Sequence, residues 1–199
     1  MSVNLTKGQK VSLTKDNPGL NEVTVGLGWD EARPKSGFFA SIFSSNDNDF
    51  DCDASAILLQ SGKYVDKDDL VYFGHLKHSS GSVAHSGDNL TGGGDGDDEQ
   101  ININLQRVPA KYDKIVIVVN IYAAHQRHQD FGMIENAFVR VVDRRNNKEL
   151  LRYNLTENYK GMTAMVFAEI YRNNGEWKFN AVGFGTKDGS INELTRRYQ

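Results

Sequence analysis

The sequence contains a single cysteine, Cys52, so the chain of 199 residues cannot form a disulfide within itself. Scarce cysteine is typical of proteins from reducing compartments. No segment approaches the roughly 20 apolar residues that cross a bilayer. The first residues, MSVNLTKGQKVSLTK, also lack the apolar centre of a signal peptide. We therefore expect a cytoplasmic protein whose membrane association is indirect.

The sequence also lacks a marked charge of either sign. Its net charge of −3 provides no basic surface for nucleic acid. A hydrophobic fraction of 39% and a charged fraction of 25% are those of an ordinary globular protein, so we expect a packed core. No long linker, low-complexity tract or repeat divides the chain. We therefore predict a single domain over residues 1–199.

Short apolar segments with period-two alternation dominate the rest of the sequence. Ile101, Ile103 and Leu105 fall on one face of a strand, and the β-branched residues 114–123 are typical of a central strand buried on both faces. Further strands are predicted over 22–29, 53–59, 70–76, 137–143, 149–155, 164–172 and 176–184. Ser190 and Glu193 form a helix-capping pattern in the tail, and weaker helical signals lie at 128–136 and 157–160. The expected fold is an all-β, two-sheet β-sandwich with a short C-terminal helix.

The segment GDNLTGGGDGDDE, residues 87–99, combines five carboxylates with five glycines. Neighbouring carboxylates repel one another, and a hard cation such as Ca²⁺, which takes about 6–8 oxygen ligands, removes the repulsion. The spacing is not that of an EF-hand, because the third and fifth positions counted from Asp88 are Leu90 and Gly92. The segment lacks the lysine of a phosphate-binding loop, and its single copy excludes a calcium-binding β-helix. A solvated acidic linker stays open as the alternative.

A second acidic pair, Asp51 and Asp53, lies at the start of a predicted strand. Residues two apart share a face, and this face continues into Ile57 and Leu59. The pair is therefore expected at the lip of a sheet, where a loop from elsewhere can close over it. Exposed acids at a strand end are the alternative. Cys52 points to the opposite face, where we expect a small buried residue rather than a ligand.

Together these segments resemble the TerD-domain family, the tellurium-resistance and general-stress proteins of bacteria. The resemblance covers essentially the whole chain and rests on VGLGWD (25–30), DCDASAILL (51–59) and the acidic segment 87–99. It implies a β-sandwich that binds Ca²⁺, with two ions at adjacent sites. Cys52, Asp130 and Ser86 depart from the residues usual in the family. The metal ligands that the resemblance implies are Asp88, Asn89, Asp97, Asp98 and Glu99, with Asp51 and Asp53 facing them, and also Asp30 and Glu169.

The resemblance implies a calcium-binding stress-response protein that controls an interaction with a protein partner, such as another stress-operon protein. Catalysis is not expected, because the sequence has no Gly-x-Ser-x-Gly motif and no histidine close to Cys52. His125 and His128 have the spacing of helical metal ligands, but no further ligand completes that set. Glu169 lies within an apolar strand, where it is expected to bind metal or to pair with Arg172 or Arg140.

Two functions of other classes stay open. One is a Ca²⁺-dependent membrane- or glycan-binding module, for which the apolar residues of SGFFASIF (36–43) could insert into lipid. Such a segment is more often a core strand. The other is a metal-dependent hydrolase that uses the same acidic cluster.

Overall fold

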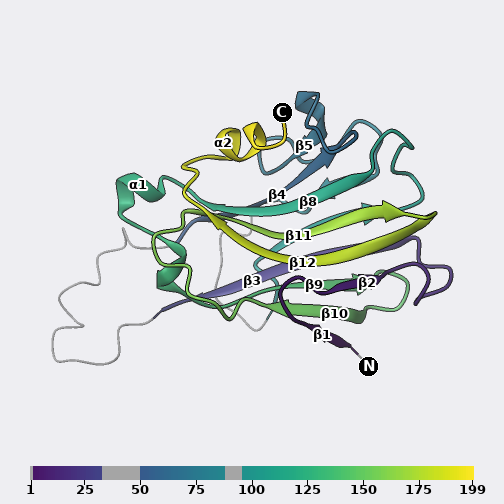
Figure 1. Ribbon diagram of the computed structural model, residues 1–199, viewed down its shortest axis with the longest axis horizontal. Coiled ribbons are helices and arrows are strands. Elements are labelled where there is room, and N and C mark those ends of the chain that lie inside the picture. The colour runs from purple at the N-terminus through teal and green to yellow at the C-terminus, as the bar shows by residue number, and fades with distance from the viewer. Residues whose placement is uncertain (1, 33–49, 88–95) are drawn as a thin grey trace.

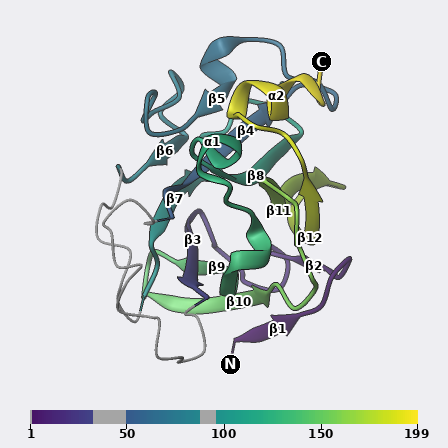
Figure 2. The ribbon, with the colours of Figure 1, turned by 90° about the vertical axis from the view of Figure 1, so that its left-hand side faces the viewer.

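The computed structural model describes residues 2–32, 50–87 and 96–199, and it contains two six-stranded sheets. The two sheets lie face to face, as the end view in Figure 2 shows, which confirms the predicted all-β sandwich. The first sheet has the order β1 (Val3–Leu5), β10 (Lys148–Asn154), β9 (Ile134–Asp143), β3 (Glu22–Glu31), β7 (Glu99–Asn104), β6 (Val83–His85). The second has the order β2 (Lys10–Ser12), β12 (Glu176–Thr186), β11 (Ala164–Asn173), β8 (Lys114–Ile121), β4 (Cys52–Leu59), β5 (Leu70–Val71).

The core lies between the sheets and follows from the period-two alternation. On β3, Val23, Val25 and Leu27 point inward, and on β7 Ile101 and Ile103 do the same. Each of these side chains is fully buried, and complete burial of such a side chain contributes about 1.5–3 kcal/mol. The opposite faces of these strands, which look away from the second sheet, carry polar residues and glycines.

Strand β8 is apolar throughout because both of its faces are covered. Ile115, Ile117 and Val119 point into the sandwich, whereas Val116 and Val118 belong to a second apolar cluster on the outer face. The C-terminal helix α2 (Ile191–Arg196) lies over this outer face (Figure 1). The prediction of a strand buried on both faces is confirmed.

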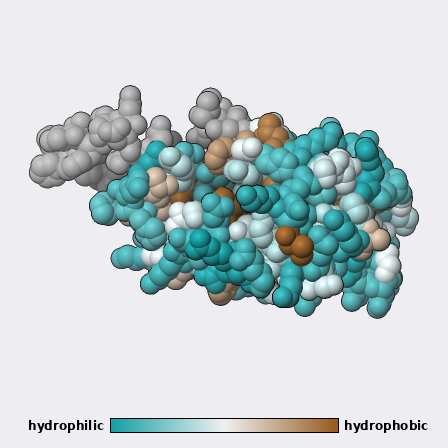
Figure 3. All heavy atoms as spheres, turned by 90° about the horizontal axis from the view of Figure 1, so that it is seen from above, coloured by the Kyte–Doolittle hydropathy of each residue, from teal (hydrophilic) through white to brown (hydrophobic). Residues whose placement is uncertain are grey.

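The predicted helical tail is also confirmed. The Ser190 hydroxyl accepts the backbone N–H of Glu193 at 3.3 Å, and the Glu193 carboxylate accepts the N–H of Gly189 at 2.8 Å. Leu194 then packs against the outer cluster with Ile57. Viewed from the side of α2, the described surface is mostly hydrophilic, with hydrophobic residues in small separate groups (Figure 3).

Three predicted elements differ in the structure. The strand expected over 70–76 ends at Val71, because Tyr72 and His75 exchange backbone hydrogen bonds of 3.1 and 2.9 Å and the chain reverses at Phe73 and Gly74. No helix forms over 157–160. The signal at 128–136 corresponds to a single 3₁₀ turn, η2 (Phe131–Met133), which the Asp130 carboxylate caps, and β9 follows at once.

The edge strands β1, β2 and β6 were not predicted, because three residues are too few to show an alternation. The remaining helical segments are η1 (Lys67–Asp69) and α1 (Ala124–Arg127). None of the helices in the described part of the chain is long and apolar enough to cross a membrane. The predicted apolar segment 36–43 lies outside the described residues.

Candidate functional site

Three acidic strand ends meet at one end of the sandwich, on the left in Figure 1. The end of β3 lies beside the start of β7, because Leu27 pairs with Glu99 in the antiparallel register. The start of β4 is close by: burial, and then the charges of Asp53, Asp51, Asp98 and Glu31, raise the pKa of the Cys52 thiol. We call this region the acidic end and define it by Asp30, Glu31, Asp51, Asp53, Asp97, Asp98 and Glu99.

Asp98 is partly buried at this end, and among the described residues no Lys, Arg or His lies within 4 Å of its carboxylate. Its backbone N–H donates to the Leu27 carbonyl at 2.8 Å, and its Oδ2 accepts the Trp29 N–H at 2.8 Å. Burial raises the pKa of Asp98, and the charges of Asp30, Asp97 and Glu99 add to the rise. The Trp29 hydrogen bond offsets only part of this effect. Keeping Asp98 ionised in the folded state therefore costs free energy, and a bound cation would remove that cost.

Asp97, its neighbour, is already neutralised. Its carboxylate lies 2.7 Å from Nε and 3.1 Å from Nη2 of Arg140, and Gln100 donates to it at 3.0 Å. The side chain is only 1% exposed and lies flat over Gly26, where a Cβ would collide with the carboxylate. The same pairing raises the pKa of Arg140. Asp97 thus occupies the outer face of the first sheet as half of an ion pair.

Glu99 points into the sandwich and is 5% exposed. Its Oε2 lies 2.8 Å from His85 Nε2, which is also 3.1 Å from the Ala54 carbonyl. The other ring nitrogen, Nδ1, lies 3.1 Å from the donating N–H of Gly87. Because Nδ1 accepts a hydrogen bond, this network assigns the proton to Nε2. His85 therefore connects both ends of the acidic segment to β4.

Asp53 belongs to β4, and Asp51 directly precedes the strand. Asp53 pairs with Asn120 in register and lies on the face of Ile57, which is the outer face of the second sheet. Cys52 points inward and is buried, as expected. Asp51 is exposed, and its carbonyl accepts the Tyr122 N–H at 2.7 Å. Asp53 therefore lies on the outer face of the second sheet and Asp97 on the outer face of the first, so, contrary to the prediction, these two carboxylates do not face each other.

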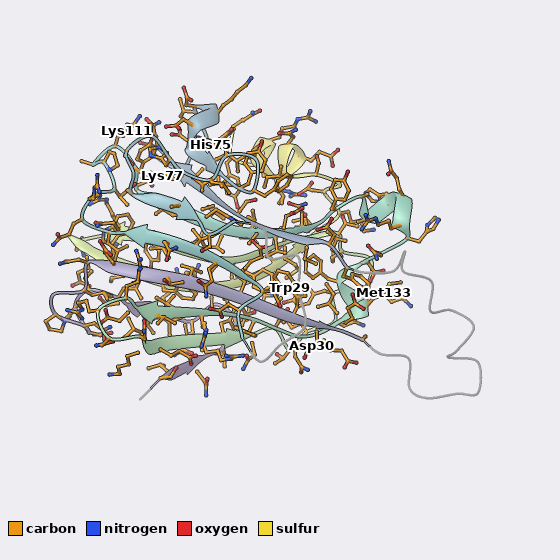
Figure 4. All side chains as sticks on the ribbon, turned by 180° about the vertical axis from the view of Figure 1, so that it is seen from behind. Trp29, Asp30, His75, Lys77, Lys111 and Met133 are labelled. Atoms are coloured by element: carbon orange, nitrogen blue, oxygen red, sulfur yellow. The ribbon has the colours of Figure 1, made fainter. Side chains whose placement is uncertain are left out.

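Asp30 and Glu31 complete the acidic end from β3. Asn136 donates to the Asp30 carboxylate at 2.8 Å, and the Phe50 N–H donates to Glu31 at 2.9 Å. Both acids are exposed, and Asp30 lies beside Trp29 at the end of β3 (Figure 4). Glu31 was not among the predicted ligands, although it directly follows Asp30 in the sequence.

Glu169 is the one predicted ligand in the described residues that the structure places elsewhere. It lies on the outer face of the second sheet, where Lys114 approaches its Oε1 at 2.7 Å and Asn180 donates to its Oε2 at 3.0 Å. Glu169 pairs in register with Val116 of β8, whereas Asp53 pairs with Asn120, four residues further along the same strand. The ion-pair partner of Glu169 is therefore Lys114, and neither Arg172 nor Arg140.

The donor chemistry of the acidic end suits a hard divalent cation, because carboxylate oxygens are the ligands that Ca²⁺ prefers. Within residues 2–32, 50–87 and 96–199, no three His, Cys, Asp or Glu side chains are already grouped as a metal-binding set. The predicted ligands Asp88 and Asn89 lie outside the described residues. Asp98, Asp30 and Asp51 are the described carboxylates best suited to take part, whereas Asp97 and Glu99 are engaged by Arg140 and His85.

Comparisons with known proteins agree with the fold and the sequence motifs. A sequence profile of the TerD domain matches residues 1–198. The "Stress response protein SCP2" of Bacillus subtilis is 52% identical over 198 residues, which cover 100% of both chains. The "Tellurium resistance protein TerD" of Serratia marcescens is 50% identical over 190 residues, 95% of this chain and 93% of that one. A solved homologue of the telluride resistance protein from Streptomyces coelicolor has a TM-score of 0.65 at 23% identity, covering 91% of this chain and 99% of its own.

Proposed function

The chain belongs to the TerD-domain family, and we propose that it is a cytoplasmic stress-response protein of the tellurium-resistance type that binds calcium at its acidic end. We further propose that it is not an enzyme, and that the calcium-bound form presents a surface to a protein partner. The names of its relatives support the stress-response part. The geometry of the acidic end supports the calcium part.

The observation that carries the calcium proposal is the environment of Asp98. This carboxylate is partly buried among other acids, and its pKa is raised first by burial and then by those neighbours. Arg140, which lines the same cavity as Asp98, is engaged by Asp97 and by Glu149 at 3.3 Å. A carboxylate kept ionised without a cation costs stability, and such a group is a frequent feature of binding sites.

Calcium binding would remove this cost and raise the free energy of unfolding. A ligand that binds only the folded state adds about 2.7 kcal/mol at a free concentration of 100 Kd. The resemblance to the family leads us to expect two ions, with Asp88 and Asn89 contributing ligands in addition to the described carboxylates. The partner would then recognise a surface whose charge depends on calcium.

Calcium titration by calorimetry of EDTA-stripped protein tests this proposal. The Asp98→Asn variant removes one charge but keeps an oxygen that can accept the Trp29 N–H, so the fold should be retained. Asp16→Asn makes the same charge change at an exposed turn and is the matched control. We expect the parent and the control to bind Ca²⁺ and the Asp98 variant to bind at least tenfold more weakly. Equal affinities for all three proteins would reject the site.

A further inference from the structure

An open cavity of about 740 Å³ adjoins the acidic end on the outer face of the first sheet. The Phe138 ring in its lining lies over β3 at Gly28, where a Cβ would collide with the ring. Trp29 and Asp30 mark the position of the cavity in Figure 4. The lining comes from β3, β9, β10 and the residues around them, and it includes Trp29, Asp30, Asp98, Phe138, Arg140 and Arg152.

The cavity carries charges of opposite sign on different parts of its wall. Asp30 and Asp98 lie at the acidic end, and Arg140 and Arg152 come from β9 and β10. Arg140 is engaged by Asp97 through two nitrogens. The positive charge of Arg152 is less closely paired with carboxylates than that of Arg140.

Arg152 is held in place without being fully paired. Its guanidinium carbon lies 3.6 Å from the centroid of the Phe138 ring, and its Nε donates to Asn154 at 3.0 Å. The nearest carboxylate oxygen, on Glu149, is 3.8 Å from Nη1. Among the described residues, no hydrogen-bond acceptor is found for Nη2. A guanidinium that is fixed by stacking, with terminal nitrogens still available, is well prepared to bind an oxyanion.

We propose that this cavity binds a phosphate monoester, with the Arg152 guanidinium holding one side of the phosphate and the calcium-loaded acidic end holding the other. A phosphate monoester has three terminal oxygens and up to two negative charges, so it can contact a guanidinium and a divalent cation at the same time. This inference rests on the calcium site of the proposed function. It adds the class of ligand, which the family relationship does not state.

The two ligands must then bind cooperatively. Without calcium, the charges of Asp30 and Asp98 repel an anion that enters the cavity. With calcium bound, that repulsion is removed. We expect calcium to strengthen phosphate binding at least tenfold, and by linkage the phosphate must strengthen calcium binding by the same factor.

The test uses the full chain and glycerol 1-phosphate as the probe, titrated by calorimetry into EDTA-stripped and calcium-loaded protein. Arg152→Gln removes the cavity charge. Arg144→Gln, the control, removes the same charge from a 47% exposed side chain that pairs with Glu22 at 3.3 Å, beyond the other end of β9. We expect both variants to bind calcium like the parent, and Arg152→Gln alone to lose phosphate affinity at least tenfold.

The two tryptophan indole signals in NMR spectra locate the binding. Trp29 lines the cavity, whereas Trp177 donates its indole N–H to the Leu105 carbonyl at 3.1 Å in the core. The phosphate ester should shift the Trp29 signal in the calcium form and leave that of Trp177 unchanged. Calcium-loaded parent that gives no heat with the ester, or an Arg152→Gln variant that binds it as well as the parent, overturns the proposal. If the parent itself does not bind calcium, that result instead refutes the proposed function.

A second arm identifies the source of the phosphate. Phosphatidylcholine vesicles with and without phosphatidic acid are sedimented with the calcium-loaded protein. Calcium-dependent sedimentation that requires phosphatidic acid and Arg152 assigns a lipid headgroup. Binding of glycerol 1-phosphate without sedimentation assigns a soluble ester. The absence of both kinds of binding refutes the inference.

Discussion

Replacing His85 with alanine should destabilise the protein and weaken its calcium binding. The imidazole is 1% exposed and lies 2.8 Å from the Glu99 carboxylate, which is itself 5% exposed. Its other nitrogen accepts the N–H of Gly87. The variant therefore removes the hydrogen bond to the Ala54 carbonyl and the close contact with Glu99, and it releases both ends of the acidic segment, Gly87 and Glu99.

The magnitude of the destabilisation follows from these contacts. Leaving the buried Ala54 carbonyl without its donor costs about 1–3 kcal/mol, and the space left by a buried ring adds about 1 kcal/mol. We expect a loss of about 3 kcal/mol in the free energy of unfolding, measured by urea denaturation in EDTA. For a chain of this length, such a loss lowers Tm by about 6–12 °C. Calcium affinity should fall at least tenfold.

His85→Gln and His125→Ala are the companion variants for this measurement. Glutamine keeps an N–H donor for the Ala54 carbonyl, so it should recover part of the stability and of the calcium affinity. His125 is exposed on α1, and its loss should change the free energy of unfolding by less than about 0.5 kcal/mol. A His85→Ala variant as stable as the parent would show that the Ala54 and Glu99 contacts contribute nothing, and the reasoning would fail.

Three further predictions concern single residues. Asp98→Asn should stabilise the calcium-free protein at neutral pH. The pKa of Asp98 is raised in the folded state, so ionisation of this carboxyl above its ordinary value of 3.8 opposes folding. Melting curves from pH 4 to 7 should therefore show a difference in Tm between variant and parent that grows with pH. Gly26→Ala should cost about 2 kcal/mol by displacing the Asp97 carboxylate, whereas Gly96→Ala, where a Cβ meets nothing within 4 Å, should cost less than about 0.5 kcal/mol in urea titrations. Ser190→Ala should cost about 1 kcal/mol by removing the α2 cap, and an unchanged urea midpoint would contradict that role.

The sandwich could be predicted from the sequence because each long strand carries its own evidence. Period-two alternation marks the half-buried β7, and the continuous β-branched residues mark β8, which is covered on both faces. Short edge strands carry no such pattern, since three residues pair only because longer neighbours are already in place. The premature end of β5 depended on a hairpin turn at Phe73 and Gly74, which an apolar segment does not reveal.

Most acids of the acidic end, though not Glu31, could be predicted from the sequence, but their partners could not. Asp97 meets Arg140 because the register of β3 with β9 places Arg140 opposite Gly26, where the absent side chain leaves room for the carboxylate. His85 meets Glu99 through the pairing of β6 with β7. Both contacts depend on strand register, which is a property of the whole sheet and not of either segment.

Calcium calorimetry on the EDTA-stripped parent, with Asp98→Asn and Asp16→Asn beside it, tests the central claim most directly. We predict saturable binding by the parent and by the Asp16 variant, a rise in Tm with calcium for both, and at least tenfold weaker binding by the Asp98 variant. No heat and no rise in Tm for the parent at millimolar Ca²⁺ would contradict the account, and the acidic end would then be a solvated surface.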